Sequence, residues 1–166
     1  RYSSSAASDV YKRQYKELPK TLKTGDQAPD FEALLVDGRT VPLSQLIERG
    51  PLMLNFIRGT WCMFCRSHMG SVHRWLKEVR KNVTVLVVTN EDLDRVREWK
   101  AKEQMSYLMA SDPEQSIIKK FGLELTDEEF ARPAVFLIDK DQQIRMAHYA
   151  KRTNVIQKTE KLLKEV

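Results

Sequence analysis

The chain has 166 residues and a formal net charge of +5 at pH 7, and hydrophobic residues make up 42% of it. That length suffices for one domain whose core needs no disulfide or metal support. No stretch approaches the ~20 apolar residues of a membrane span. Basic residues are interleaved with acidic ones, whereas a nucleic-acid-binding surface would show one-sided basic clusters. We therefore expect a soluble domain that binds no nucleic acid.

The first fourteen residues differ in character from the rest. Residues 1–14, RYSSSAASDVYKRQ, carry a run of Ser and Ala but no apolar periodicity and no apolar core of signal-peptide length. We interpret them as an artefact of cloning or sequencing, joined to a single domain at 15–166. We expect a cytoplasmic protein. The periplasm and export stay as alternatives, because a native leader could have been lost at this end.

The N-terminal part of the domain predicts a β-hairpin, a short helix and a buried strand. Residues 33–43, ALLVDGRTVPL, combine an apolar run, an Asp-Gly turn and an edge strand that tolerates Pro42. Ser44 is placed to cap the short helix. The nearly continuous apolar run at 52–57, LMLNFI, is typical of a strand covered on both faces.

A βαβ unit is predicted next. Apolar residues recur at helical spacing after the cysteines, at Met69, Val72, Leu76 and Val79. They indicate an amphipathic helix from Cys62 to about Lys81. The run VTVLVV at 83–88 is a second buried strand, and parallel pairing of the two strands needs a right-handed crossover through the helix.

The second half predicts further helices and strands. These are a helix at 92–103, a strand at 107–110, a helix that starts at Asp112-Pro113 and ends at Gly122, antiparallel strands at 133–139 and 144–148, and a last helix from Asn154. The whole order describes an α/β sandwich with a central mixed sheet flanked by helices.

The two cysteines of the chain lie in WCMFC, at 61–65, where a buried strand passes into a helix. A cysteine in the first turn of a helix is close to the positive end of the helix dipole and to unpaired amides, which favour the thiolate. Two intervening residues let Cys65 reach back to Cys62 and resolve a mixed disulfide there. In a βαβ unit this spacing is typical of a thioredoxin-like redox pair.

Other uses of the cysteine pair fit less well. A haem anchor needs His after the second cysteine, and Arg66 is there. Zinc needs two more ligands, and the spacing of His68 and His73 fits a zinc finger poorly. Two inert buried cysteines remain an alternative, although the apolar run ends just before Cys62 and predicts an exposed corner. We expect a redox-active disulfide with no metal and no other cofactor.

Five segments carry a family pattern in order: GDQAPDF at 25–31, DGRTVPLSQL at 37–46, NFIRGTWCMFC at 55–65, SDPEQSIIKKFGL at 111–123 and PAVFLIDKDQQIR at 133–145. Together they resemble the peroxiredoxin-like group of the thioredoxin superfamily, related to alkyl hydroperoxide reductase and thiol-specific antioxidant proteins. The resemblance covers most of residues 25–166. It implies a thioredoxin-like, glutaredoxin-type sandwich with a role in antioxidant redox chemistry.

The resemblance also implies roles for residues around the motif. Cys62 would be the attacking cysteine and Cys65 its resolving partner. Trp61 matches the aromatic residue before the first cysteine, and Pro133 matches a cis-proline that faces the disulfide. The alternative for Pro133 is a trans proline that merely starts a strand. Arg58 would bias Cys62 toward the thiolate.

The sequence departs from the peroxiredoxin pattern at three positions. Peroxiredoxins resemble one another in a Pro-x-x-x-Thr-x-x-Cys approach and a distant Arg, which orient a peroxide. Here Asn55 and Gly59 occupy the Pro and Thr positions, and Pro133 occupies the Arg position. Thr60 and Arg58 are nearby polar substitutes and Arg132 is displaced by one residue, but none of them is in register.

The thioredoxin pattern has its own departures. Met63 replaces the proline common between the cysteines, and Asn55 lies near the place of a buried acid, so no general base for Cys65 is identified. His68 lies one turn past Cys65 but shares a helical row with Val72, which favours a packed or rim histidine over a base.

We therefore expect a thiol–disulfide oxidoreductase of the peroxiredoxin-like type. Its substrates would be protein or small-molecule disulfides and thiols, or a hydroperoxide, with a thioredoxin-type reductant as electron donor. The first alternative is a thiol-dependent peroxidase, in which Cys62 passes through a sulfenic acid and condenses with Cys65. The second is a non-catalytic thioredoxin-fold binding module.

Overall fold

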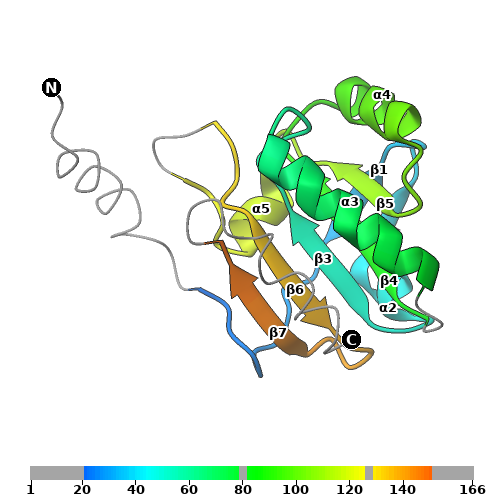
Figure 1. Cartoon of the computed structure of the whole chain (residues 1–166). Coiled ribbons are helices and arrows are strands. Elements are labelled where there is room, and N and C mark those ends of the chain that lie inside the picture. The colour runs from blue at the N-terminus through cyan, green and yellow to red at the C-terminus, as the bar shows by residue number, and fades with distance from the viewer. Residues whose placement is uncertain (1–20, 79–81, 126–128, 151–166) are drawn as a thin grey trace, which may run out of the picture.

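A computed structural model describes residues 21–78, 82–125 and 129–150 (Figure 1). Residues 1–14 and the expected last helix lie outside these residues. The elements are β1 (Glu32–Leu35), β2 (Thr40–Pro42), α2 (Leu43–Ile47), β3 (Leu52–Phe56), α3 (Met63–Glu78), β4 (Thr84–Thr89), α4 (Leu93–Glu103), β5 (Leu108–Ser111), α5 (Ser116–Lys120), β6 (Ala134–Ile138) and β7 (Ile144–Tyr149). None of the helices described is long and apolar enough to cross a membrane.

The described strands form one mixed sheet in the order β2-β1-β5-β4-β3-β6-β7. Strands β3, β4 and β5 are parallel neighbours at its centre, and α3 connects β3 to β4. All five residues of β3 are buried, as expected for a strand covered on both faces. The predicted βαβ unit is therefore confirmed.

Antiparallel strands extend the sheet on both sides. The predicted hairpin of β1 and β2 is present, with Gly38 at φ +88° in its turn, and β1 pairs antiparallel with β5. A positive φ is readily adopted by glycine, which explains the Asp-Gly turn. On the other side, β6 pairs antiparallel with β3, and β7 with β6. The predicted mixed sheet with an N-terminal hairpin is confirmed.

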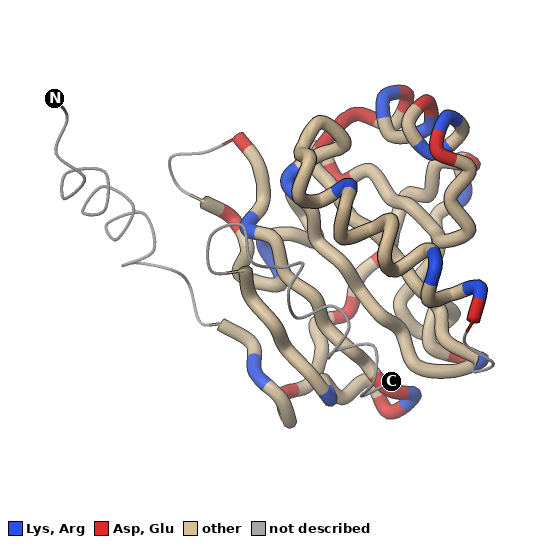
Figure 2. Tube along the Cα trace, viewed as in Figure 1, with Lys and Arg blue, Asp and Glu red and all other residues tan. Residues whose placement is uncertain are grey.

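Charged residues follow the expected pattern on the exposed helix α4. Its sequence, LDRVREWKAKE, alternates acids and bases around the buried Val96 and Trp99. Figure 2 shows this alternation as blue and red segments along the helix. The helix thus presents a mixed charge to solvent, as the sequence predicts.

Two helix starts differ from their predictions. Ser44 does not cap α2: the helix begins at Leu43 without a side-chain cap, and the Leu43 N–H donates instead to the Phe31 carbonyl at 2.9 Å. Helix α5 begins at Ser116, because a turn follows Asp112. The buried Asp112 carboxylate still caps this helix, accepting the N–H groups of Ser116, Ile117 and Ile118 at 2.8–2.9 Å.

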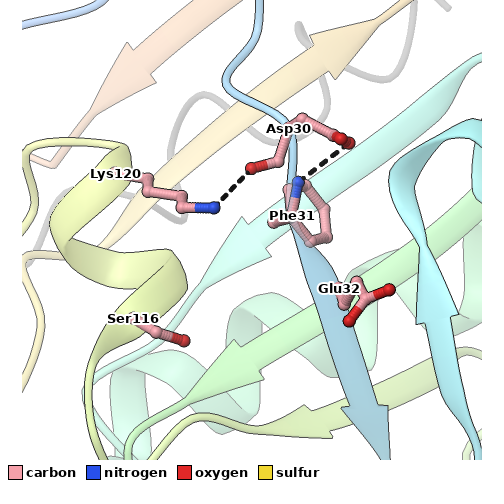
Figure 3. Close-up of a pocket in the computed structure, with 5 residues that line it drawn as sticks. All are labelled: Asp30, Phe31, Glu32, Ser116 and Lys120. Atoms are coloured by element: carbon pink, nitrogen blue, oxygen red, sulfur yellow. Dashed lines mark hydrogen bonds between the residues drawn. The ribbon is translucent and has the colours of Figure 1, made fainter.

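The C-terminal end of α5 contacts the chain just before β1 (Figure 3). Lys120 Nζ donates to the Asp30 carbonyl at 2.8 Å, and the Asp30 side chain accepts the N–H of Phe31 at 3.0 Å. A shallow open pocket lies between these groups, lined also by Glu32 and Ser116. The contact links the C-terminal end of α5 to the chain before β1.

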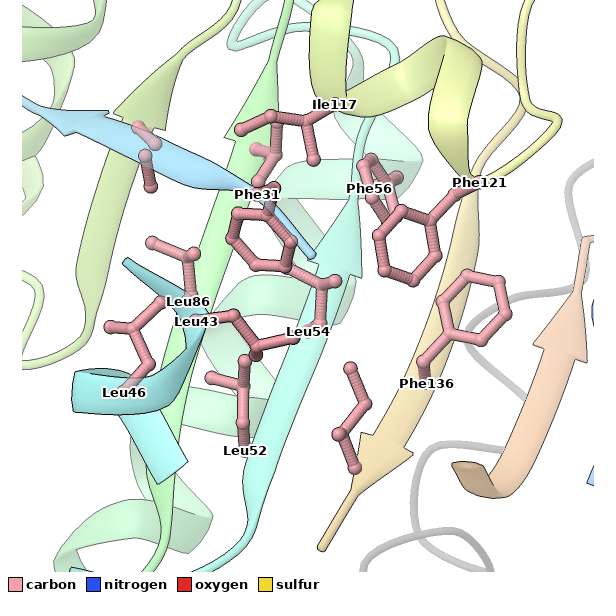
Figure 4. Packing of buried hydrophobic residues seen from close by; sticks show 14 of the residues in the cluster. Phe31, Leu43, Leu46, Leu52, Leu54, Phe56, Leu86, Ile117, Phe121 and Phe136 are labelled. Atoms are coloured by element: carbon pink, nitrogen blue, oxygen red, sulfur yellow. The ribbon is translucent and has the colours of Figure 1, made fainter. Parts of the chain in front are cut away.

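Each face of the sheet has its own core. Beneath α2 and α5, the Phe121 ring packs against Phe56 and Phe136 at centroid distances of 5.2 and 5.1 Å (Figure 4). Beneath α3 and α4 lies a second cluster, which contains Met69, Val72, Val96 and Trp99 together with Cys62 and Cys65. Alternation along β3 sends Leu54 and Phe56 to the first core and Met53 to the second, and Ile57, just after the strand, also belongs to the second.

Candidate active site

The two cysteines lie where β3 passes into α3. Cys62 immediately precedes the helix: its N–H donates to the Gly59 carbonyl at 3.2 Å, and its carbonyl accepts the Arg66 N–H at 2.9 Å. Cys65 lies in the first turn. Both residues are only 6% exposed, so the prediction that Cys62 occupies an exposed corner is wrong. The reason is that the first turn of α3 packs onto the core beneath the helix.

The surroundings of Cys62 favour its thiolate. A hydrogen bond from the Cys65 thiol is the main cause that lowers the pKa of Cys62, to about 6, against the opposing effect of burial. The Cys65 N–H, which lies 3.4 Å from Cys62 Sγ, the Arg58 charge and the Phe64 N–H lower it further. These surroundings thus favour the ionised, nucleophilic form of the Cys62 sulfur.

The surroundings of Cys65 have the opposite effect. Its hydrogen bond to Cys62 and its burial raise the pKa of Cys65 above the ordinary value. The thiol of Cys65 thus keeps its proton while Cys62 is charged. This is the asymmetry expected of an attacking thiolate and a resolving thiol one turn away.

The loop between β3 and α3 is held by an acid that the sequence did not single out. The Glu91 carboxylate, at the end of β4, accepts the N–H of Thr60 at 2.5 Å and its hydroxyl at 3.0 Å. Arg95 pairs with the same carboxylate at 3.0 Å, and the Glu91 side chain is only 9% exposed. The hydroxyl of Thr60 is therefore bonded to Glu91. The acidic stretch around Glu91 reads as a helix start, and nothing in it signals this contact.

Gly59 provides room for Trp61. A Cβ atom on Gly59 would lie 2.4 Å from Trp61 Nε1 and 2.8 Å from Trp61 Cδ1. The indole ring thus occupies the space that a side chain at position 59 would need. Trp61 remains 54% exposed and lies near two other exposed apolar residues, Met63 and Phe64.

Phe130 brings Arg58 and Trp61 together. The Trp61 ring meets the Phe130 ring edge-on at 5.7 Å, and the Arg58 guanidinium lies over the same ring at 4.8 Å. Phe130 belongs to the stretch LELTDEEFAR, whose polarity indicates a surface insert. Sequence reasoning therefore missed it.

The Arg132–Pro133 bond is trans, so the predicted cis-proline is wrong. Pro133 directly precedes β6, and its carbonyl accepts the Ala150 N–H at 2.9 Å, which continues the pairing of β6 with β7. An extended trans residue fits this strand start. The Arg132 guanidinium lies over the Tyr149 ring at 4.8 Å. The expected roles of Pro133 and Arg132 in docking remain predictions.

His68 is packed in the core, as the sequence favours. It is 2% exposed, and its Nε2 lies 3.1 Å from Asn55 Oδ1. The Asn55 amide donates to the Met53 carbonyl, so its oxygen faces the imidazole as an acceptor. Burial lowers the pKa of His68 to about 4. A neutral histidine at this position is a structural partner of Asn55.

The fold and the cysteine pair together define a class, the proteins of thioredoxin-like fold that carry a Cys-x-x-Cys pair at the start of a helix. Residues 21–78, 82–125 and 129–150 contain no cluster of His, Cys, Asp or Glu side chains suited to a metal ion.

Solved structures share the fold at low identity. A peroxidoxin, BcpB, from Mycobacterium tuberculosis has a TM-score of 0.74 and 20% identity, covering 87% of this chain and 98% of that one. A thiol peroxidase from Chromobacterium violaceum has a TM-score of 0.77 and 15% identity, covering 89% and 90%.

The family is given by the sequence comparison. The profile of the AhpC/TSA family matches residues 24–147. The chloroplastic 2-Cys peroxiredoxin BAS1 of Spinacia oleracea is 29% identical over 154 residues, which is 86% of this chain and 57% of that protein. The chain thus spans little more than half the length of this relative. It belongs to the AhpC/TSA family.

Proposed function

We propose that the protein is a thiol-dependent peroxidase that reduces hydroperoxides. The Cys62 thiolate attacks the outer oxygen of the hydroperoxide, the O–O bond breaks, and the leaving alkoxide takes up a proton to depart as an alcohol. Cys62 then carries a sulfenic acid. Cys65 gives up its proton as its sulfur attacks Cys62, the S–O bond of the sulfenic acid breaks, the leaving hydroxide takes up that proton to depart as water, and a Cys62–Cys65 disulfide forms. A thioredoxin-type dithiol reduces the disulfide and is itself oxidised.

One observation carries the proposal: the hydrogen bonds from Cys65 to the Cys62 sulfur. They support a thiolate on Cys62 and keep a protonated thiol one turn away, with the two residues already in contact. Attack on an electrophile needs the thiolate, and a proton held on Cys65 leaves Cys62 as the sulfur that reacts first. Membership of the AhpC/TSA family supports a hydroperoxide as the electrophile.

Thiol–disulfide exchange is the second candidate, and the loop before Cys62 favours it. Gly59 has no hydroxyl where the peroxiredoxin pattern has Thr, and the hydroxyl of Thr60 is bonded to Glu91. The exposed Trp61 would instead offer an apolar contact to a disulfide-bearing partner. Both candidates use the same attacking sulfur and differ in the electrophile.

Stopped-flow oxidation of the reduced protein separates the two. We expect hydrogen peroxide or an alkyl hydroperoxide to oxidise Cys62 orders of magnitude faster than it oxidises free cysteine, after correction for the fraction of thiolate. A peroxide rate no faster than that of free thiolate, with rapid exchange against a small disulfide, would instead select the second candidate. If neither a peroxide nor a disulfide oxidises Cys62 rapidly, the remaining alternative is a non-catalytic binding module of thioredoxin-like fold.

Variants of the pair provide the controls. Cys62→Ser should abolish both reactions, because the attacking sulfur is gone. Met63→Leu, an exposed apolar change between the two cysteines, should leave the thiol pair and its reduction by a dithiol intact.

A further inference from the structure

Phe130 lies between two residues of the active-site loop and lacks an assigned role. Its ring is in edge contact with Trp61 and in face contact with the Arg58 guanidinium. A cation over an aromatic face is attracted by the ring quadrupole. Phe130 is therefore placed to fix the position of the Arg58 charge.

The backbone around Phe130 is itself held in place. The Asn90 side chain, just beyond β4, donates to the Glu129 carbonyl. On the other side, Ala131 is buried and the Arg132 N–H donates to the Leu123 carbonyl at 2.8 Å. With an anchor before it and after it, the ring is presented to the loop from a defined position.

Among the described residues, none forms an ion pair that would neutralise the charge of Arg58. Within the part of the chain that the structure describes, Arg58 Nε has no hydrogen-bond partner. A carboxylate in place of the ring would hold the guanidinium but cancel its field at nearby atoms. The ring face holds it and leaves the positive charge to act on its surroundings.

We propose that Phe130 is a positioning residue, whose ring keeps the Arg58 guanidinium beside Cys62 so that its charge favours the thiolate. The proposal rests on the proposed role of Cys62 as the nucleophile and is independent of whether its electrophile is a hydroperoxide or a disulfide. Support comes from the direction of the electrostatic effect, since the Arg58 charge lowers the pKa of Cys62.

The test measures the thiolate itself in the full chain. Iodoacetamide labelling of the reduced protein at a series of pH values, followed by mass spectrometry, gives the apparent pKa of Cys62. Phe130→Leu keeps an apolar side chain and removes the quadrupole, and should raise that pKa by roughly half a unit to one unit. Phe130→Tyr keeps an aromatic face and should restore the wild-type value.

A double-mutant cycle shows whether Phe130 acts through Arg58. In an Arg58→Gln background, Phe130→Leu should have no further effect on the pKa of Cys62, because the charge it positions is gone. Tyr149→Leu is the matched control, since it removes the ring beneath Arg132, at the same 4.8 Å, and should not change this pKa. Thermal melts of every variant report on folding.

The outcomes are distinguishable. If wild-type Cys62 shows an ordinary thiol pKa, the nucleophile assignment and with it the proposed function are wrong. A depressed pKa in the wild type that is unchanged in a folded Phe130→Leu variant overturns the role of Phe130 alone. Additive effects of Phe130→Leu and Arg58→Gln would also overturn it, because the ring would then act by another route.

Discussion

The two thiols of the pair have opposite environments although they are separated by two residues. The Cys62 sulfur receives hydrogen bonds at the helix start, and Cys65 gives two of them, from its thiol and from its N–H. Each state supports the other, because a charged Cys62 makes ionisation of Cys65 costly. Their pKa values are therefore a property of the pair.

Replacing Cys65 separates its electrostatic role from its chemical one. Cys65→Ala removes the thiol donor, which is the largest cause of the low pKa of Cys62, and should raise that pKa. Cys65→Ser keeps a hydroxyl donor and should preserve a low pKa. Neither variant can close the disulfide, so both should accumulate sulfenic acid on Cys62 after peroxide treatment.

Trapping with dimedone and mass spectrometry would measure this intermediate, while the pH dependence of alkylation would give the pKa. Equal pKa values in the Ala and Ser variants would contradict the role of the thiol donor. Rapid loss of sulfenic acid without Cys65 would contradict its role in resolution.

Gly59→Thr tests whether Trp61 excludes a side chain at this position. The new Cβ would meet the indole ring at 2.4–2.8 Å, so the exposed Trp61 should swing outward instead of the loop unfolding. We expect a change in tryptophan fluorescence with little loss of thermal stability. The control is the same substitution in a Trp61→Phe background, where the signal of Trp61 is absent. If Gly59→Thr changes the fluorescence no more with Trp61 present than in this background, the ring does not move.

The residues of the site were predicted unequally from the sequence. Cys62, Cys65 and Trp61 form a contiguous motif whose spacing carries chemical meaning. Glu91 and Phe130 reach the same loop from the ends of other elements, through contacts that depend on three-dimensional packing. No local pattern distinguishes them from ordinary surface residues, so they could be recognised only in the folded chain.

The loop between β3 and α3 is shaped by the neighbouring strand β4. Strand β4 is apolar but has a polar end, formed by its last residue, Thr89, and by Glu91 just beyond it. The Glu91 carboxylate accepts hydrogen bonds from the backbone N–H and the hydroxyl of Thr60. Parallel neighbours end at the same edge of a sheet, which brings the loop and the carboxylate together.

Glu91→Ala should destabilise the protein and loosen the loop. It leaves the Thr60 N–H without its acceptor in a poorly exposed position, at a cost of about 1–3 kcal/mol in the free energy of unfolding. Glu91→Gln keeps an acceptor oxygen and should cost less. Urea denaturation would measure both, with Glu98→Ala, an exposed carboxylate of α4, as the control. A Glu91→Ala variant as stable as this control would contradict the role of the contact.

Element types were predicted well and element ends less well. The apolar runs of β3 and β4 and the periodicity of α3 and α4 reflect burial that a sequence records directly. The start of α5 was misplaced because Asp112 caps it from beyond an intervening turn, and the start of α2 because a backbone carbonyl of Phe31 replaces a side-chain cap. Such ends depend on partners from elsewhere in the chain.

The sheet joins two cores of different character. The core beneath α2 and α5 contains a group of packed aromatic rings, while the core beneath α3 contains the thiols and the buried pair of His68 and Asn55. The pairing of β3 with β6 and of β6 with β7 places Asn55, Val135 and His148 in one row across the sheet. Sequence periodicity predicts the strands but cannot predict this row, which depends on the strand order.

The buried His68 should make the stability of the fold depend on pH below neutrality. Burial and the charge of His148 lower the pKa of His68 from 6.5 to about 4. Between these values the unfolded chain binds the proton more readily than the folded one, so stability is fully present above about pH 6.5 and is lost as the pH falls toward 4. The loss amounts to up to about 3 kcal/mol in the free energy of unfolding.

His68→Gln keeps a hydrogen-bond donor for Asn55 but cannot titrate, and should therefore be less sensitive to acid than the wild type. Urea denaturation at pH values across this range would measure the difference, and His73→Gln, on the same helix but only partly buried, should behave as the wild type does. If wild type and His68→Gln lose stability in parallel as the pH falls, His68 is not the group responsible.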